Sequence, residues 1–208
     1  MIPSSVIAVF FLASSLLALA PGPDNIFVLT QAALRGWRAG LMVTLGLCTG
    51  LIGHTLAVAF GVAAVFQASA AAFTALKLTG AAYLLWLAYQ TMRASAQDLS
   101  SRKQENLSWS RLYRRGIIMN ITNPKVSIFF LAFLPQFADP ARGGVALQMI
   151  SLGLIFIFSA LLIFGAISLT AGALGDRLRR STKAQILMNR IAGAVYAGLA
   201  LRLATAGS

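Results

Sequence analysis

Asp24 is the one acidic residue that lies inside an apolar stretch of this chain. The other four acids lie in polar segments or at the ends of apolar ones: Asp98, Glu105, Asp139 and Asp176. A carboxylate is costly in a nonpolar membrane interior, so it is a functional candidate there by default. Asp24 could bind the ammonium group of a substrate or carry a coupling proton. Alternatively, it caps the helix expected to start at Asn25.

A second polar group interrupts a later apolar stretch and contains Asn120, Asn123 and Lys125. With Asn25, these amides offer hydrogen-bond donors and acceptors to an amino or carboxyl group. Lys125 could pair with Asp24 or receive a substrate carboxylate. Alternatively, its flexible stem carries the amine to the membrane surface. The sequence leaves open whether the Asp24 and Lys125 side chains meet.

Two further ionisable residues lie within apolar segments. His54 is the only histidine, and it could relay protons or fill a structural place in the core. Lys77 lies near the start of its apolar segment, and we expect it to extend outward to the membrane surface.

Prolines break the two segments that carry these polar groups. Pro21, Gly22 and Pro23 directly precede Asp24, and Pro124 separates Asn123 from Lys125. Proline lacks a backbone N–H and clashes with the carbonyl one turn back, so each helix must break there. Inside a membrane, such backbone is tolerated only where it packs in protein or lines a polar cavity. The breaks are therefore the first candidates for a substrate site.

The composition indicates an all-α integral membrane protein. Hydrophobic residues make up 58% of the 208 residues and charged residues 11%, with a mean hydropathy of +0.79; soluble domains carry about 25% charged residues. The net charge of +12 could suggest nucleic acid, but the basic residues lie between apolar segments and fit membrane topology better. The single Cys48 excludes an intrachain disulfide.

Apolar runs of about 20 residues predict six transmembrane spans in one domain covering residues 1–208. The predicted spans are 4–20, 41–66, 72–92, 116–137, 145–174 and 184–204. Lys and Arg gather in the first, third and fifth loops, whereas the other side has Arg142 and Arg202. The positive-inside rule then places the long loop 94–112 in the cytoplasm and both termini on the periplasmic side.

The first and fourth predicted spans are the broken ones, and each opens a set of three. This pattern is typical of two inverted three-helix repeats, here residues 1–93 and 113–208, whose broken helices form a site at mid-membrane. Two unrelated proline kinks are the alternative. Gly46 with Gly50, and Gly193 with Ala197, form small-xxx-small steps that suit internal helix packing or a homo-oligomer contact.

The motifs together resemble the lysine exporter (LysE) and homoserine/threonine resistance (RhtB) family of bacterial inner-membrane efflux proteins. The resemblance covers the whole chain in order. It rests on residues 21–25 (PGPDN), 36–40 (GWRAG), 77–84 (KLTGAAYL), 116–125 (GIIMNITNPK) and 189–193 (NRIAG).

The resemblance implies a proton-driven exporter of amino acids or derivatives such as homoserine, threonine or homoserine lactone, without enzymatic activity or cofactor. Its substrate site would comprise Asp24, Asn25, Asn120, Asn123 and Lys125, with Asp24 and His54 as proton-coupling groups. A metal-ion or small-cation exporter is the alternative, although Asp24, His54 and Cys48 are its only candidate ligands within the spans. A membrane-embedded enzyme or a structural subunit is a third, but no catalytic constellation supports the enzyme.

Overall fold

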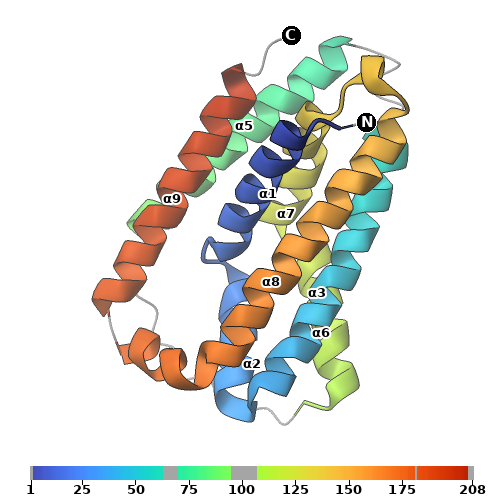
Figure 1. Cartoon of the computed structure of the whole chain (residues 1–208). Coiled ribbons are helices and arrows are strands. Elements are labelled where there is room, and N and C mark those ends of the chain that lie inside the picture. The colour runs from blue at the N-terminus through green and yellow to red at the C-terminus, as the bar shows by residue number, and fades with distance from the viewer. Residues whose placement is uncertain (1, 63–69, 95–106, 181, 206–208) are drawn as a thin grey trace.

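The computed structural model describes residues 2–62, 70–94, 107–180 and 182–205, and within these ranges it contains helices and no strands. For residues 62, 70, 72–73, 172–180 and 184 it describes the backbone only. The helices run roughly along one axis and form an elongated bundle (Figure 1). Most of the predicted cytoplasmic loop 94–112 lies outside the described residues.

The first predicted break is present between α1 (Ser4–Leu19) and α2 (Pro23–Arg35), whose axes differ by 63°. Pro23 occupies the first position of α2, where the N–H that it lacks would have no partner within the helix. Gly36 follows α2 with a φ of 87°, a conformation that side chains disfavour, and this allows the chain to reverse into α3 (Trp37–Ala57).

The second predicted break is also present. α6 (Trp109–Ile121) and the helical run that starts with α7 (Pro124–Ile128) differ in direction by 50°. A π-helical turn, η2 (Phe129–Phe133), and a 3-10 turn, η3 (Leu134–Phe137), continue that run. Pro124 again takes the first helical position, and the Asn123 side chain caps the helix by accepting from the Lys125 N–H at 3.1 Å.

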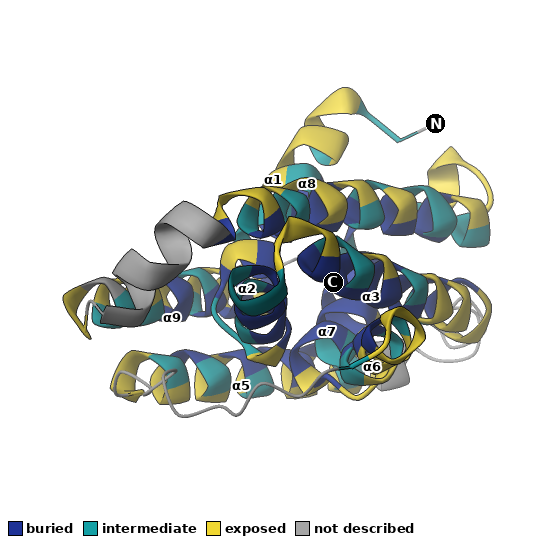
Figure 2. Cartoon of the chain, turned by 90° about the horizontal axis from the view of Figure 1, so that it is seen from below, coloured by how far each residue is buried: buried dark blue, intermediate teal, exposed yellow. Residues whose placement is uncertain are grey.

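The remaining helices enclose the two broken pairs. α3 ends in a π-helical turn, η1 (Val58–Val62), and packs along both α6 and α8 (Val145–Arg180). α5 (Ala70–Arg93) packs along α9 (Thr182–Thr205). Seen from below, buried positions face the interior of the bundle and exposed positions face outward (Figure 2).

Three described segments are long and apolar enough to cross a membrane: Trp37–Gly61, Val145–Ala171 and Gln185–Thr205. If each bent pair is one span, the number rises to five. The arrangement of six spans in two inverted repeats stays a prediction. The start of α1 and the end of α9 lie at the same end of the bundle (Figure 1), which is what the prediction of six spans expects.

Phenylalanines fill the core around the second break. Phe129 packs against Phe10 of α1 and Phe156 of α8, with ring centroids 5.9 and 5.2 Å apart. The outward faces carry large apolar side chains, including Leu147, Phe60 and Leu169, each at least 65% exposed. Such a surface is unfavourable in water and suits contact with lipid tails.

Glycines set the closest helix contacts. A Cβ on Gly46 would collide with the carbonyl oxygen of Tyr113 on α6, and a Cβ on Gly50 would lie 2.7 Å from the Asn120 side chain. A Cβ on Gly193 of α9 would collide with Met92 of α5. These small residues therefore allow helices to pack closely inside the chain, which is the internal-packing interpretation of the small-xxx-small steps.

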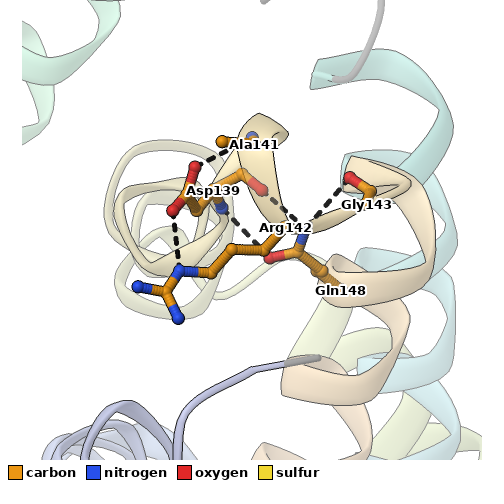
Figure 3. Close-up of polar contacts among 5 residues, drawn as sticks. All are labelled: Asp139, Ala141, Arg142, Gly143 and Gln148. Atoms are coloured by element: carbon orange, nitrogen blue, oxygen red, sulfur yellow. Dashed lines mark hydrogen bonds and ion pairs between the residues drawn. The ribbon is translucent and has the colours of Figure 1, made fainter.

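A compact turn joins the second broken pair to α8 and includes a short 3-10 helix, η4 (Pro140–Arg142). The Asp139 carboxylate accepts from Arg142 Nε at 2.8 Å and from the Ala141 N–H at 2.9 Å (Figure 3). Gln148 of α8 ties the turn down by donating to the Asp139 and Gly143 carbonyls and accepting from the Asp139 N–H. The hydrogen bond from Arg142, and then that from Ala141, hold the pKa of Asp139 below its ordinary value.

Candidate substrate-binding site

The two helix breaks meet in the interior of the bundle. Asp24 lies in the first turn of α2, and its Oδ2 accepts a hydrogen bond from Asn123 Nδ2 at 2.9 Å. The two residues are 99 positions apart in the chain and are 2% and 3% exposed. The same Asn123 caps α7 through its Oδ1, so its amide connects the two breaks directly.

The Asp24 side chain does not cap its own helix. The N-cap of α2 is Gly22, and among the described residues the Asp24 carboxylate accepts from Asn123 and from no backbone N–H. The capping alternative is therefore wrong. The carboxylate still lies at the N-terminus of α2, where the helix dipole favours negative charge.

Lys125 closes the C-terminal end of α1. Its Nζ donates to the carbonyls of Leu17 and Ala20, at 3.2 and 3.1 Å, and the residue is 6% exposed. A Cβ on Gly22 would lie 3.2 Å from this Nζ, so glycine at that position leaves room for the ammonium. Carbonyls at the end of a helix lack partners within it, and here the buried cation supplies them. Lys125 thus does not extend to the membrane surface.

Asp24 and Lys125 do not form a direct ion pair in the described part of the chain, because each side chain is held by other groups. In this conformation, therefore, the Asp24 and Lys125 side chains do not meet. The carboxylate and the ammonium belong to the same buried cluster, and each lies at the helix end that favours its charge.

Asn25 and Asn120 have different surroundings. Asn25 Nδ2 donates to the Ala18 carbonyl at 2.6 Å, which satisfies a third carbonyl at the end of α1. Asn120 lies near the end of α6, and its backbone carbonyl oxygen is 3.2 Å from Nε2 of His54 on α3. The His54 ring also packs against Phe130, with centroids 5.5 Å apart. His54 therefore contacts the second break.

Three buried acceptor oxygens of these residues have no hydrogen-bond partner among the described residues: Asp24 Oδ1, Asn25 Oδ1 and Asn120 Oδ1. Buried polar atoms are nearly always paired, because an unpaired one costs about 1–3 kcal/mol. All three are acceptors and one carries negative charge. The group that suits them best is a donor-rich cation such as an alkylammonium.

Three residues are placed differently from what the sequence suggested. Lys77 is 8% exposed and lies within the protein, so the expectation that it extends outward is wrong. Gln31 and Arg35 were not among the predicted site residues, yet each has a buried polar atom without a partner in the described structure. Their spacing of seven and eleven residues from Asp24 is the signal that could have identified them, because it puts all three on one face of a helix.

The arrangement offers little to a metal ion. Among the described residues, no three His, Cys, Asp or Glu side chains lie close enough together to hold one. Cys48 is buried in α3 as a free thiol.

Comparison with known proteins identifies the family. A family model described as LysE type translocator matches residues 15–207. A homoserine/homoserine lactone efflux protein of Salmonella typhi is 34% identical over 198 residues, 95% of each chain. One of the same name from Salmonella typhimurium is 40% identical over 142 residues, 68% of each chain.

An uncharacterized membrane protein of Vibrio cholerae is 35% identical over 198 residues, again 95% of each chain. No solved structure matches the chain. Because the family match spans nearly the whole chain and two relatives align along 95% of it, this protein belongs to the LysE type translocator family, whose members are membrane transporters and not enzymes.

Proposed function

We propose that this protein is a secondary exporter that carries amino acids or amino-acid derivatives, such as homoserine, threonine or homoserine lactone, out of the bacterial cell in exchange for protons. Family membership and the names of the Salmonella relatives support amino-acid efflux. The observation that carries the proposal is a buried carboxylate, Asp24, with one oxygen unpaired at the point where two broken helices meet.

In the proposed mechanism the cargo's ammonium group binds at Asp24 Oδ1. The unpaired oxygens of Asn25 and Asn120 supply further acceptors on the cargo's path. Lys125 uses two of its three N–H donors on the Leu17 and Ala20 carbonyls, so one donor remains for the cargo's carboxylate. Asn123 holds the Asp24 carboxylate in place by donating to its Oδ2, which leaves Asp24 Oδ1 for the cargo.

Proton coupling follows from the same carboxylate. When the site opens to the periplasm, a proton binds Asp24, removes its negative charge and releases the cargo's ammonium. When the site opens to the cytoplasm, Asp24 loses the proton and can bind cargo again. His54, next to the Asn120 carbonyl, is the second candidate for carrying a proton at the site.

Alternating access is proposed to proceed by rocking one three-helix half against the other, with the interlocked breaks as the fixed point. The protein would lie in the inner membrane with both termini on the periplasmic side. The Asp24–Asn123 hydrogen bond is then a contact between the two halves, which are expected to move relative to each other.

The first test measures efflux of preloaded, labelled amino acids from cells that express the protein, with and without an uncoupler. The panel should span basic, neutral and sulfur-containing amino acids together with homoserine and its lactone. We expect export of one class above the vector control, and we expect the uncoupler to abolish it. Export that persists with the uncoupler would overturn the proton coupling, and no export of any compound would overturn the function.

The second test is the Asp24→Asn variant, which retains an acceptor for Asn123 but cannot carry the negative charge. We expect it to remain in the membrane at normal abundance while export falls to the vector level. Asp139→Asn is the matched control, because Asp139 lies in the exposed turn and makes its contacts away from the breaks. Wild-type export by the Asp24 variant would disprove the mechanism.

A further inference from the structure

Two polar side chains on α2, those of Gln31 and Arg35, each have a buried polar atom and play no part in the site at the breaks. Gln31 is 8% exposed, and its Oε1 has no hydrogen-bond partner in the described structure. Arg35 is half-buried in the last turn of α2, and its Nη1 likewise lacks a partner there. A guanidinium N–H and an amide oxygen hidden from solvent without partners are costly, so packing alone does not account for them.

These side chains continue the face of α2 that carries Asp24. With 3.6 residues per turn, positions 24, 31 and 35 fall within about 40° of one another around the helix axis. Val28, between them on the same face, is fully buried. With a rise of about 1.5 Å per residue, Gln31 and Arg35 lie roughly 10 and 16 Å from Asp24 along the axis, toward the end of the bundle where the basic loops are.

The contacts of Arg35 leave at least one of its hydrogen-bond donors, Nη1, without a partner in the described structure. Its guanidinium carbon lies 5.9 Å from the centre of the Trp109 ring on α6, a cation–π contact. Nearby, Arg115 of α6 makes the same kind of contact with Phe27 of α2, at 4.9 Å. A cation–π contact does not use up the N–H donors of a guanidinium, and those donors match a carboxylate geometrically.

We infer that Gln31 and Arg35 form an inner subsite that holds the cargo before its ammonium group reaches Asp24. In it, Arg35 Nη1 donates to the cargo's carboxylate and Gln31 Oε1 accepts from its ammonium. This inference rests on the proposed export function and adds to it a specificity-determining position. In an α-amino acid the ammonium and carboxylate are attached to the same carbon, so one molecule cannot span the distance from Arg35 to Asp24. The cargo therefore occupies the inner subsite and the Asp24 site in succession along one face of α2.

Homoserine and its lactone should depend differently on the inner subsite. Homoserine carries both an ammonium and a free carboxylate, whereas its lactone keeps the ammonium but has its carboxylate tied up as an ester. Both should depend on Asp24. Both should also depend on Gln31, whose Oε1 accepts from an ammonium. Only homoserine should depend on Arg35, because only homoserine has the anionic group that a guanidinium binds.

The experiment measures initial transport rates in energised inside-out membrane vesicles, where added cargo meets the cytoplasmic face directly. The variants are Arg35→Gln, Arg35→Lys and Gln31→Leu, with rates normalised to protein abundance. The matched control is Arg38→Gln, since Arg38 is exposed in the same basic segment and stacks on Trp37. Each variant is tested over a range of homoserine and homoserine lactone concentrations.

We expect Arg35→Gln to raise the KM for homoserine by about tenfold, the loss of one charge-assisted contact, and to change the KM for the lactone by less than about twofold. Arg35→Lys should recover part of the homoserine affinity. Gln31→Leu should raise the KM for both cargoes, because both carry the ammonium that Oε1 accepts from. Arg38→Gln should leave both values near those of the wild type.

Equal losses for both cargoes in Arg35→Gln would overturn the inference, because a residue that only stabilises the end of α2 would affect them alike. Unchanged kinetics in Arg35→Gln would also overturn it. Wild-type vesicles that transport neither cargo would overturn the inner subsite for homoserine, and the proposed function itself falls only if the efflux panel above also shows no export.

Discussion

At the scale of single residues, the site is built from side chains that satisfy broken backbone. Lys125 and Asn25 together supply donors to three carbonyls at the end of α1, while Asn123 caps α7 and holds Asp24. In a membrane interior these backbone groups have no water to bind, so the side chains have a structural role independent of any cargo. The residues proposed to bind cargo are therefore also residues that keep the breaks folded.

This dual role predicts the effect of replacing Lys125. Lys125→Met keeps most of the side-chain length but leaves the Leu17 and Ala20 carbonyls unpaired, at about 1–3 kcal/mol each. We expect a melting temperature in detergent several degrees below that of the wild type. Cys48 can report the transition, because it is buried and becomes accessible to a thiol-reactive dye on unfolding.

Lys183→Met is the control for this measurement, since it makes the same substitution at an exposed lysine. We expect its melting temperature to match the wild type. An unchanged melting temperature in Lys125→Met would mean that the two carbonyls find other partners.

At the scale of helices, two helices approach most closely where a glycine of one faces the backbone of the other. Gly46 of α3 lies against the Tyr113 carbonyl and the Gly116 Cα of α6, so the two helices touch through their main chains. Gly53, two turns further along α3, faces open space. The α3–α6 contact positions Asn120 and His54 next to the second break.

The contrast between these glycines gives a prediction of opposite signs. Gly46→Ala forces α3 and α6 apart, and we expect it to destabilise the protein by about 1–3 kcal/mol, as overpacking does. Gly53→Ala meets no neighbour and raises helix propensity, so we expect the melting temperature to stay the same or rise slightly. The dye assay with Cys48 measures both. Equal effects of the two substitutions would show that the contact does not limit stability.

At the scale of the whole molecule, charge and chain direction agree. The ends of the chain lie together at one end of the bundle, and the turn containing η4 lies at the same end (Figure 1). α2 ends and α6 begins at the opposite end, next to the basic segments. On the positive-inside rule, we propose that this basic end faces the cytoplasm.

Orientation can be measured with a membrane-impermeant maleimide, because the native Cys48 is buried and gives little background. We expect Ala141→Cys, in the turn before α8, to react in intact cells once the outer membrane is permeabilised. We expect Ser108→Cys, at the start of α6, to react only when the inner membrane is opened. Both positions are exposed. The reverse pattern would invert the proposed topology.

The sequence by itself determined the membrane class, the two helix breaks and the residues at them. These features are local, because a proline removes its own N–H whatever surrounds it, and a run of apolar residues needs lipid or a core wherever it lies. The family motifs added the expectation of a transporter, which the family match confirms.

Only the tertiary structure decided which of these groups meet. Asn123 reaches Asp24, Lys125 turns to the carbonyls of α1, Lys77 is enclosed, and Gln31 and Arg35 are left with buried, unpaired atoms. The partner of a polar side chain depends on how helices far apart in the sequence pack. No local sequence pattern records which of those helices lie side by side. A lysine in an apolar run can reach a membrane surface or a helix end, and the choice follows from which carbonyls the fold brings within 3.2 Å of its nitrogen.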